Sequence, residues 1–104
     1  MKLEPVSNIE IAADDSLLVV GLESGGSQSY QYVYRAAAGV YWDDNVRAFK
    51  LDTKNDKRFA HWFAHVCKVL EEEMNVRLHL GNRTAWTNVP NDVRSEIELS
   101  HGRL

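Results

Sequence analysis

The sequence has little of several features that would identify a protein class at once. Its single cysteine, Cys67, excludes an intrachain disulfide framework. The aliphatic stretch from Leu17 to Val20 is stopped by Gly21 and is far too short to span a bilayer. No apolar stretch like that of a signal peptide follows Met1. These absences predict a cytoplasmic protein with no membrane partner.

Positive charge is also scarce. The chain has 12 Lys and Arg against 15 Asp and Glu, a formal net charge of −3. Binding to a duplex normally requires a basic stripe that neutralises phosphates. The basic residues here are scattered, and the cluster of Lys54, Lys57 and Arg58 is interrupted by Asp56. The charge pattern therefore predicts no nucleic-acid partner, and its mild acidity mainly supports solubility.

Catalytic and metal-binding patterns are missing as well. His61 and His65 have the four-residue spacing of zinc peptidases, but Trp62 occupies the place of the glutamate base in their motif. At 100° per residue both histidines fall opposite the apolar face of the predicted helix. Cys67 falls within that apolar face, which predicts a small buried side chain rather than a nucleophile.

The polar loops carry turn chemistry and no recognisable ligand set. The acidic pairs Asp14-Asp15 and Asp43-Asp44 lack the oxygen-ligand spacing of a calcium loop. Gly25-Gly26 lacks the lysine of a phosphate-binding loop and is expected to close a hairpin. No catalytic constellation, metal or cofactor is therefore predicted, and the sequence favours a binding role over an enzyme.

The 104 residues, 44% of them hydrophobic and 26% charged, suit a single globular domain over residues 1–104. Period-two alternation and β-branched runs predict strands in the first half. The expected strands are 8–11, 17–22, 28–38 (extended by 40–42 past a bend at Gly39) and 46–51. They are expected to form an antiparallel meander.

The second half changes its period. Apolar residues spaced three and four apart predict an amphipathic helix over residues 55–74, with Asp52, Thr53 or Asn55 at its start and Asn75 as a left-handed end. A short strand over 76–80 and a helix from about 90 to 100 follow, and residues 84–89 are ambiguous. The order ββββαβα predicts an α+β fold, an antiparallel sheet of about four to five strands with the long helix on one face.

Aromatic residues are the most unusual feature. If 28–38 is a strand, Tyr30, Tyr32 and Tyr34 share one face of it, and Tyr41 and Trp42 lie in the same hairpin. A row of tyrosines suits an ordinary sheet core with its phenols at the rim, a subunit contact or a ligand pocket. Trp86 can either anchor its polar segment to the core or act as a binding hot spot.

These observations lead to one favoured function and two alternatives. The favoured hypothesis is a non-catalytic interaction module that self-associates as a dimer through the aromatic sheet surface. The alternatives are a small-ligand-binding protein or enzyme, with a pocket between sheet and helix whose mouth is lined by Tyr34, Tyr41 and Trp42, and an acidic inhibitor or immunity-type protein. In size and architecture the chain resembles small bacterial proteins, including those carried on mobile elements, a resemblance that assigns no residue a role.

Overall fold

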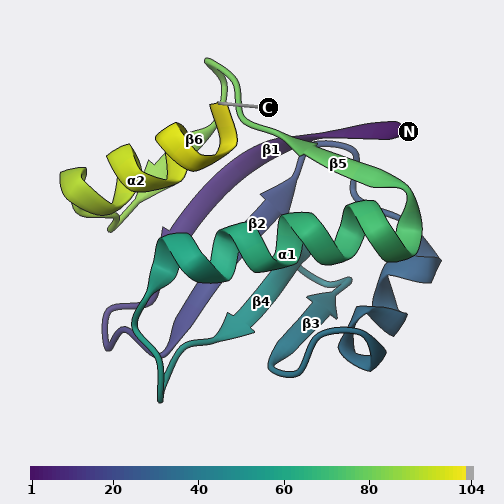
Figure 1. Ribbon diagram of the computed structural model, residues 1–104, viewed down its shortest axis with the longest axis horizontal. Helices are drawn as coiled ribbons and strands as arrows, with labels where there is room; N and C mark the ends of the chain where they lie inside the picture. The colour runs from purple at the N-terminus through teal and green to yellow at the C-terminus, as the bar shows by residue number, and fades with distance from the viewer. Residues whose placement is uncertain (103–104) are drawn as a thin grey trace.

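The computed structural model describes residues 1–102 and has an α+β architecture (Figure 1). Its elements follow the order β1 (Lys2–Ile11), β2 (Leu17–Leu22), η1 (Gln28–Arg35), β3 (Val40–Asp43), β4 (Ala48–Asp52), α1 (Phe59–Met74), β5 (Val76–His79), β6 (Ala85–Thr87) and α2 (Asn91–Gly102). The α+β class and the long helix on one face of a sheet are confirmed.

The six strands form one sheet in the order β3-β4-β2-β1-β5, with β6 also paired to β1. Strands β1 to β4 pair antiparallel, as predicted, but β2 pairs with β4 rather than with β3, so they do not form the expected meander. Strands β5 and β6 both pair parallel with β1. The sheet, expected to be antiparallel with about four to five strands, is therefore a mixed one of six. Helix α1 carries the chain back along the sheet, so β5 runs in the same direction as β4 and β1. A crossover through a helix is the usual connection between parallel strands.

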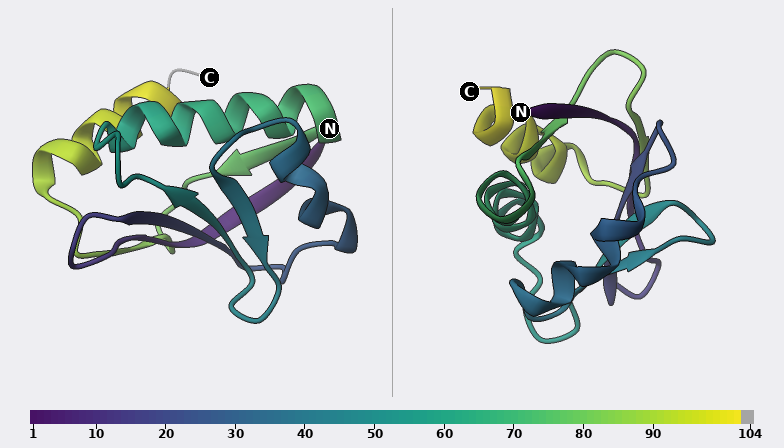
Figure 2. Two further views of the ribbon diagram at one scale, coloured as in Figure 1. Left: turned by 90° about the horizontal axis from the view of Figure 1, so that it is seen from below. Right: turned by 90° about the vertical axis from the view of Figure 1, so that its right-hand side faces the viewer.

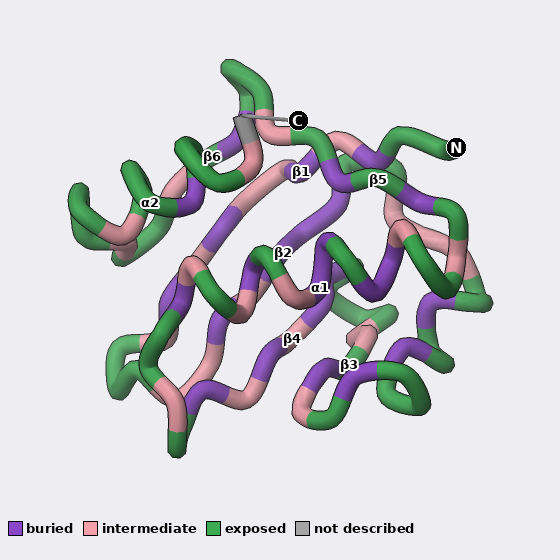
Figure 3. The backbone as a smooth tube through the Cα atoms, in the orientation of Figure 1, coloured by how far each residue is buried: buried purple, intermediate pink, exposed green. Residues whose placement is uncertain are grey.

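One face of the sheet is covered and the other is bare. Both α-helices lie on the same side, and the two further views show no helix on the opposite side (Figure 2). The covered face carries a row of side chains at paired positions in five strands: Trp86, Ile9, Val20, Phe49 and Trp42. The middle three are fully buried, and both tryptophans pack against the same hydrophobic cluster. Buried backbone positions accordingly alternate with less buried ones along these strands (Figure 3).

The predicted strand over 28–38 is wrong, because residues 28–35 form the 3-10 helix η1. Ser27 caps it by accepting a hydrogen bond from the backbone N–H of Ser29. The buried residues are Tyr30 and Val33, three apart, which matches the three residues per turn of this helix. The alternation of the tyrosines is typical of a strand, but the buried residues Tyr30 and Val33 follow the three-residue period of this helix.

Helix α1 begins later than predicted. Its N-terminal boundary residue, Arg58, makes no side-chain cap, so none of the three expected caps serves this role. Thr53 is instead fully buried and donates its hydroxyl to the backbone oxygen of Asp15 at 2.7 Å, bracing the β1–β2 turn. The C-terminal prediction is confirmed, since Asn75 has the left-handed φ of 56°.

Candidate functional site

The bare face of the sheet is built from the positions that alternate with the buried row. Register places one residue from each of five neighbouring strands in line across it: Thr87, Glu10, Val19, Lys50 and Tyr41. We call this line the outer row. Val19 lies on β2, the middle strand of the five, so two strands flank it on each side. The outer row is therefore centred on an apolar residue.

Charge is arranged about that centre. Glu10 lies on β1, on one side of Val19, and Lys50 lies on β4, on the other. The Lys50 ammonium also pairs with the Asp43 carboxylate at 2.8 Å, and both side chains are about one third exposed. Leu17, two residues before Val19 on β2, adds a second half-buried aliphatic side chain to the centre. The face thus has an apolar middle with an acidic and a basic flank.

The tyrosines predicted to share a face are separated. Tyr30 is 2% exposed and lies in the core, whereas Tyr32 and Tyr34 are 46% and 50% exposed on the outer side of η1. The Arg35 guanidinium lies 4.6 Å from the centre of the Tyr32 ring and 5.8 Å from that of Tyr34. Such stacking holds both rings by cation–π attraction. The prediction that the three tyrosines share one face is therefore wrong, although Tyr32 and Tyr34 are exposed.

The remaining predicted site residues also divide between core and surface. Tyr41 is 54% exposed in the outer row. Its neighbour Trp42 points the other way, with ring centres 5.4 Å from Tyr30 and 4.8 Å from Phe49. Trp86 packs partly against the core beneath the Arg94 guanidinium, 4.9 Å from its ring centre. Trp86 thus has the contacts of an anchor, and its role as a hot spot stays a prediction.

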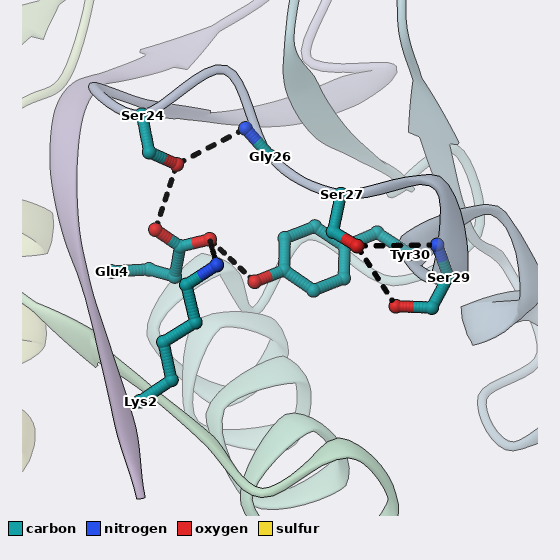
Figure 4. Close-up of polar contacts among 7 residues, drawn as sticks. All are labelled: Lys2, Glu4, Ser24, Gly26, Ser27, Ser29 and Tyr30. Atoms are coloured by element: carbon teal, nitrogen blue, oxygen red, sulfur yellow. Dashed lines mark hydrogen bonds and ion pairs between the residues drawn. The ribbon is translucent and has the colours of Figure 1, made fainter.

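A buried carboxylate joins the start of β1 to the segment before β3. Glu4 is 1% exposed, and its oxygens accept hydrogen bonds from the Tyr30 phenol and, at 2.7 Å, from the Ser24 hydroxyl. The Lys2 ammonium lies 3.8 Å from the same carboxylate. Figure 4 shows Glu4 between Ser24 and Tyr30, with Lys2 alongside. The carboxylate therefore fixes both the glycine loop and η1 to the sheet.

Burial raises the pKa of the Tyr30 phenol above its ordinary value, and the hydrogen bond to Glu4 raises it further. The phenol therefore keeps its proton and acts as a donor. Every polar atom of the pair is engaged within the protein, which gives this cluster the chemistry of a structural clamp.

A cavity of about 380 Å³ lies between α1 and α2. Phe63 and Cys67 of α1 and His101 of α2 line its inner part. The Cys67 Sγ lies 3.8 Å from the His101 Nδ1, and the Phe63 and His101 rings meet edge to face at 5.6 Å. Tyr34, Tyr41 and Trp42 do not line it, and Trp42 instead lines a separate cavity with Gln28, Gln31 and Asp44. The expected pocket between sheet and helix, with these three residues at its mouth, stays a prediction.

Burial sets the charge state of the thiol and the imidazole. It raises the pKa of the Cys67 thiol to about 12, with a smaller contribution from the Glu71 carboxylate. It lowers the pKa of His101, although a backbone hydrogen bond with Leu78 works in the opposite direction. Both groups are therefore neutral near pH 7, and the thiol is not activated as a nucleophile.

The described residues contain no group of three His, Cys, Asp or Glu side chains placed to hold a metal ion. His61 is exposed and His65 half-buried on the outward side of α1, and the expected surface pair of Lys68 and Glu72 is present at 4.0 Å. Over residues 1–102, neither helix combines the length and the apolar character needed to cross a bilayer.

Comparison with known proteins adds one finding. No protein-family model matches the sequence, and no curated protein does. A solved structure from the mobile metagenome of North West Arm Sewage Outfall, the integron cassette protein Hfx_Cass5, shares 32% identity over 98% of each chain. This chain is similar to that integron cassette protein. The TM-score is 0.42, so no contact or residue role is transferred from Hfx_Cass5.

Three features of the site could not be predicted from the sequence, and the name of Hfx_Cass5 states no activity that would indicate them. Glu4 has a detectable signal, because it is two residues from the aliphatic Val6 and shares its face. A register shift between Val6 and Asn8 then moves the buried positions to Ile9 and Ile11. The outer row requires strand register, and the Cys67–His101 contact requires the docking of α2, which no local pattern gives.

Proposed function

We propose that this protein is a non-catalytic interaction module that associates with a second copy of itself through the bare face of its sheet. The observation that carries the proposal is the symmetry of the outer row. A two-fold axis that runs parallel to β2, in the contact plane above the Val19 side chain, exchanges the strands on its two sides. The same patch then serves both copies, as an isologous contact requires.

Under that axis each side chain meets a suitable partner. Val19 faces Val19 of the second copy, and Leu17 faces its own counterpart, which forms an apolar centre. Glu10 of each copy faces Lys50 of the other, so opposite charges meet on both flanks. Tyr41 faces Thr87, placing a large amphipathic ring at the rim, where tyrosine is common in interfaces.

The size of the face is adequate. A standard interface buries about 800 Å² of each partner. The exposed surface of this protein is 6194 Å², so such a contact would cover roughly an eighth of it. Five strands at a spacing of about 4.8 Å supply a face of suitable width. Face-to-face packing of two sheets about 10 Å apart would then cover the residues of the outer row.

Charge reversal tests this arrangement. Sedimentation equilibrium of the unaltered protein should give a mass of about 24 kDa, twice 11.9 kDa, at concentrations of about 100 µM. Glu10→Lys alone or Lys50→Glu alone sets like charges against each other, and each should weaken the dimer at least about tenfold. The double variant restores opposite charges and should recover most of the affinity.

Glu73→Lys serves as the control, because it changes the net charge as Glu10→Lys does but lies on the exposed side of α1. Circular dichroism should show that all variants are folded, since Lys50→Glu also removes the pair with Asp43. A monomer at every concentration would refute self-association. A dimer that ignores both single reversals would refute this surface.

A further inference from the structure

We propose that the cavity between α1 and α2 binds a small, uncharged, ring-containing molecule against the Phe63, Cys67 and His101 side chains. This site is on the opposite side of the molecule from the outer row and does not depend on self-association. Its volume of about 380 Å³ falls within the range of roughly 300–1,000 Å³ typical of ligand pockets. An apolar cavity of about 150 Å³ already accepts benzene, so a two-ring molecule has room here.

The inner wall is aromatic and uncharged. Phe63 is buried and meets the His101 ring edge to face at 76°, so His101, the more exposed of the two, is the ring available to a flat ligand. The Cys67 thiol lies beside them as a soft, polarizable contact. Because the thiol and the imidazole are engaged with each other, neither supplies a charge or a strong anchor for an ionic group. A neutral ring is the chemistry this wall accepts.

The charged residues at the rim reinforce that choice. The Lys68 ammonium pairs with the Glu72 carboxylate at 4.0 Å, and the Glu71 carboxylate accepts from the Arg77 guanidinium at 3.0 Å. Both ion pairs are partly exposed, and within each pair the positive and negative charges balance without a ligand. An anion or cation entering the cavity would lose hydration and gain no free counter-charge. The rim therefore discriminates against charged molecules.

The groove continues along the helix pair toward the start of α1. A second cavity, of about 370 Å³, shares Ala64 and Ser100 with the first and is also lined by the exposed Leu99. Ala64 thus lies where the two cavities meet, and its small side chain leaves the passage open. The Ser100 hydroxyl stands at the same point and can bond one polar atom of a ligand.

Indole is a suitable probe, because it is a neutral two-ring molecule with one N–H donor. Titrated into the isotopically labelled full chain, it should shift the backbone amide signals of Ala64, Cys67, Ser100 and His101, with a dissociation constant of about 1 mM or lower. It should also slow labelling of Cys67, the one cysteine of the sequence, by N-ethylmaleimide. Indole-3-carboxylate should bind at least about tenfold more weakly because of its charge.

Ala64→Trp should fill the passage and weaken indole binding at least about tenfold. Ala64 is exposed, so this substitution leaves the core intact. Ala13→Trp, in the exposed β1–β2 turn, is the matched control and should bind indole as the unaltered protein does. Absence of shifts at the four amides, or equal binding by Ala64→Trp, would overturn the site. Equal binding of the carboxylate would overturn the uncharged ligand class.

Discussion

Removing the Tyr30 hydroxyl is the most direct way to test the clamp formed by Glu4, Ser24 and Tyr30. In Tyr30→Phe the ring stays in place, but the Glu4 carboxylate loses one hydrogen-bond donor. Glu4 is only 1% exposed, so water cannot replace that donor. A hydrogen bond to a charged group contributes about 1.5–3 kcal/mol to stability. We therefore expect the free energy of unfolding to fall by about 2 kcal/mol, which lowers Tm by roughly 10 °C for a chain of this size.

Urea unfolding followed by circular dichroism and by tryptophan fluorescence measures this loss, and one of the three tryptophans, Trp42, lies 5.4 Å from the Tyr30 ring. Tyr32→Phe is the matched control, because its exposed hydroxyl should leave stability within about 0.5 kcal/mol. A double-mutant cycle with Glu4→Leu separates the pair from its surroundings. Removing both polar partners should cost less than the sum of the single losses. A loss below about 0.5 kcal/mol for Tyr30→Phe, or strict additivity in the cycle, would refute the clamp.

Four further outcomes are expected. Because the folded state raises the pKa of Tyr30, the unfolded chain releases this proton first above pH 10, so stability should fall as the pH rises further, and Tyr30→Phe should lessen that slope in alkaline urea titrations. Gly26→Ala should cost at least about 2 kcal/mol, since Gly26 has a φ of 82° and an added Cβ would collide with the packed Trp42 ring; thermal unfolding measures this. Ile97→Ala should cost about 2–5 kcal/mol, because the fully buried Ile97 fixes α2 to the core, and hydrogen exchange should rise first in α2. Asn75→Val should cost about 1–2 kcal/mol while Asn75→Gly is nearly neutral, because the position is left-handed; chemical denaturation of the two variants compares them.

Periodic segments were predictable because one physical cause dominated each. Ile9 and Ile11 alternate with polar residues and form the buried side of β1, and the spacing from Phe59 to Leu70 marks the buried face of α1. Cys67 fell in that face and is buried, as expected. In each case the side chain that the core requires repeats at the period of its element.

The tyrosine segment failed because two periods coincide in it. Tyr30, Tyr32 and Tyr34 alternate as in a strand, while Tyr30 and Val33 keep the spacing of a 3-10 helix. The helical conformation is favoured by a distant contact, because the Tyr30 hydroxyl donates to the Glu4 carboxylate, 26 residues away in the sequence. Local propensity carries no information about that partner, so the segment could not be assigned from its own residues.

Strand β1 has a consequence for the order in which the molecule forms. It pairs with β2 immediately after it, yet its other edge waits for β5 and β6, and the Thr84 hydroxyl reaches the backbone oxygen of Val6 across 78 positions. During synthesis on the ribosome, the early hairpin can close while that edge stays open until residues 76–87 emerge. Such high contact order slows folding, and until β5 and β6 pair with it the edge of β1 leaves unpaired backbone groups that favour aggregation of a nascent chain.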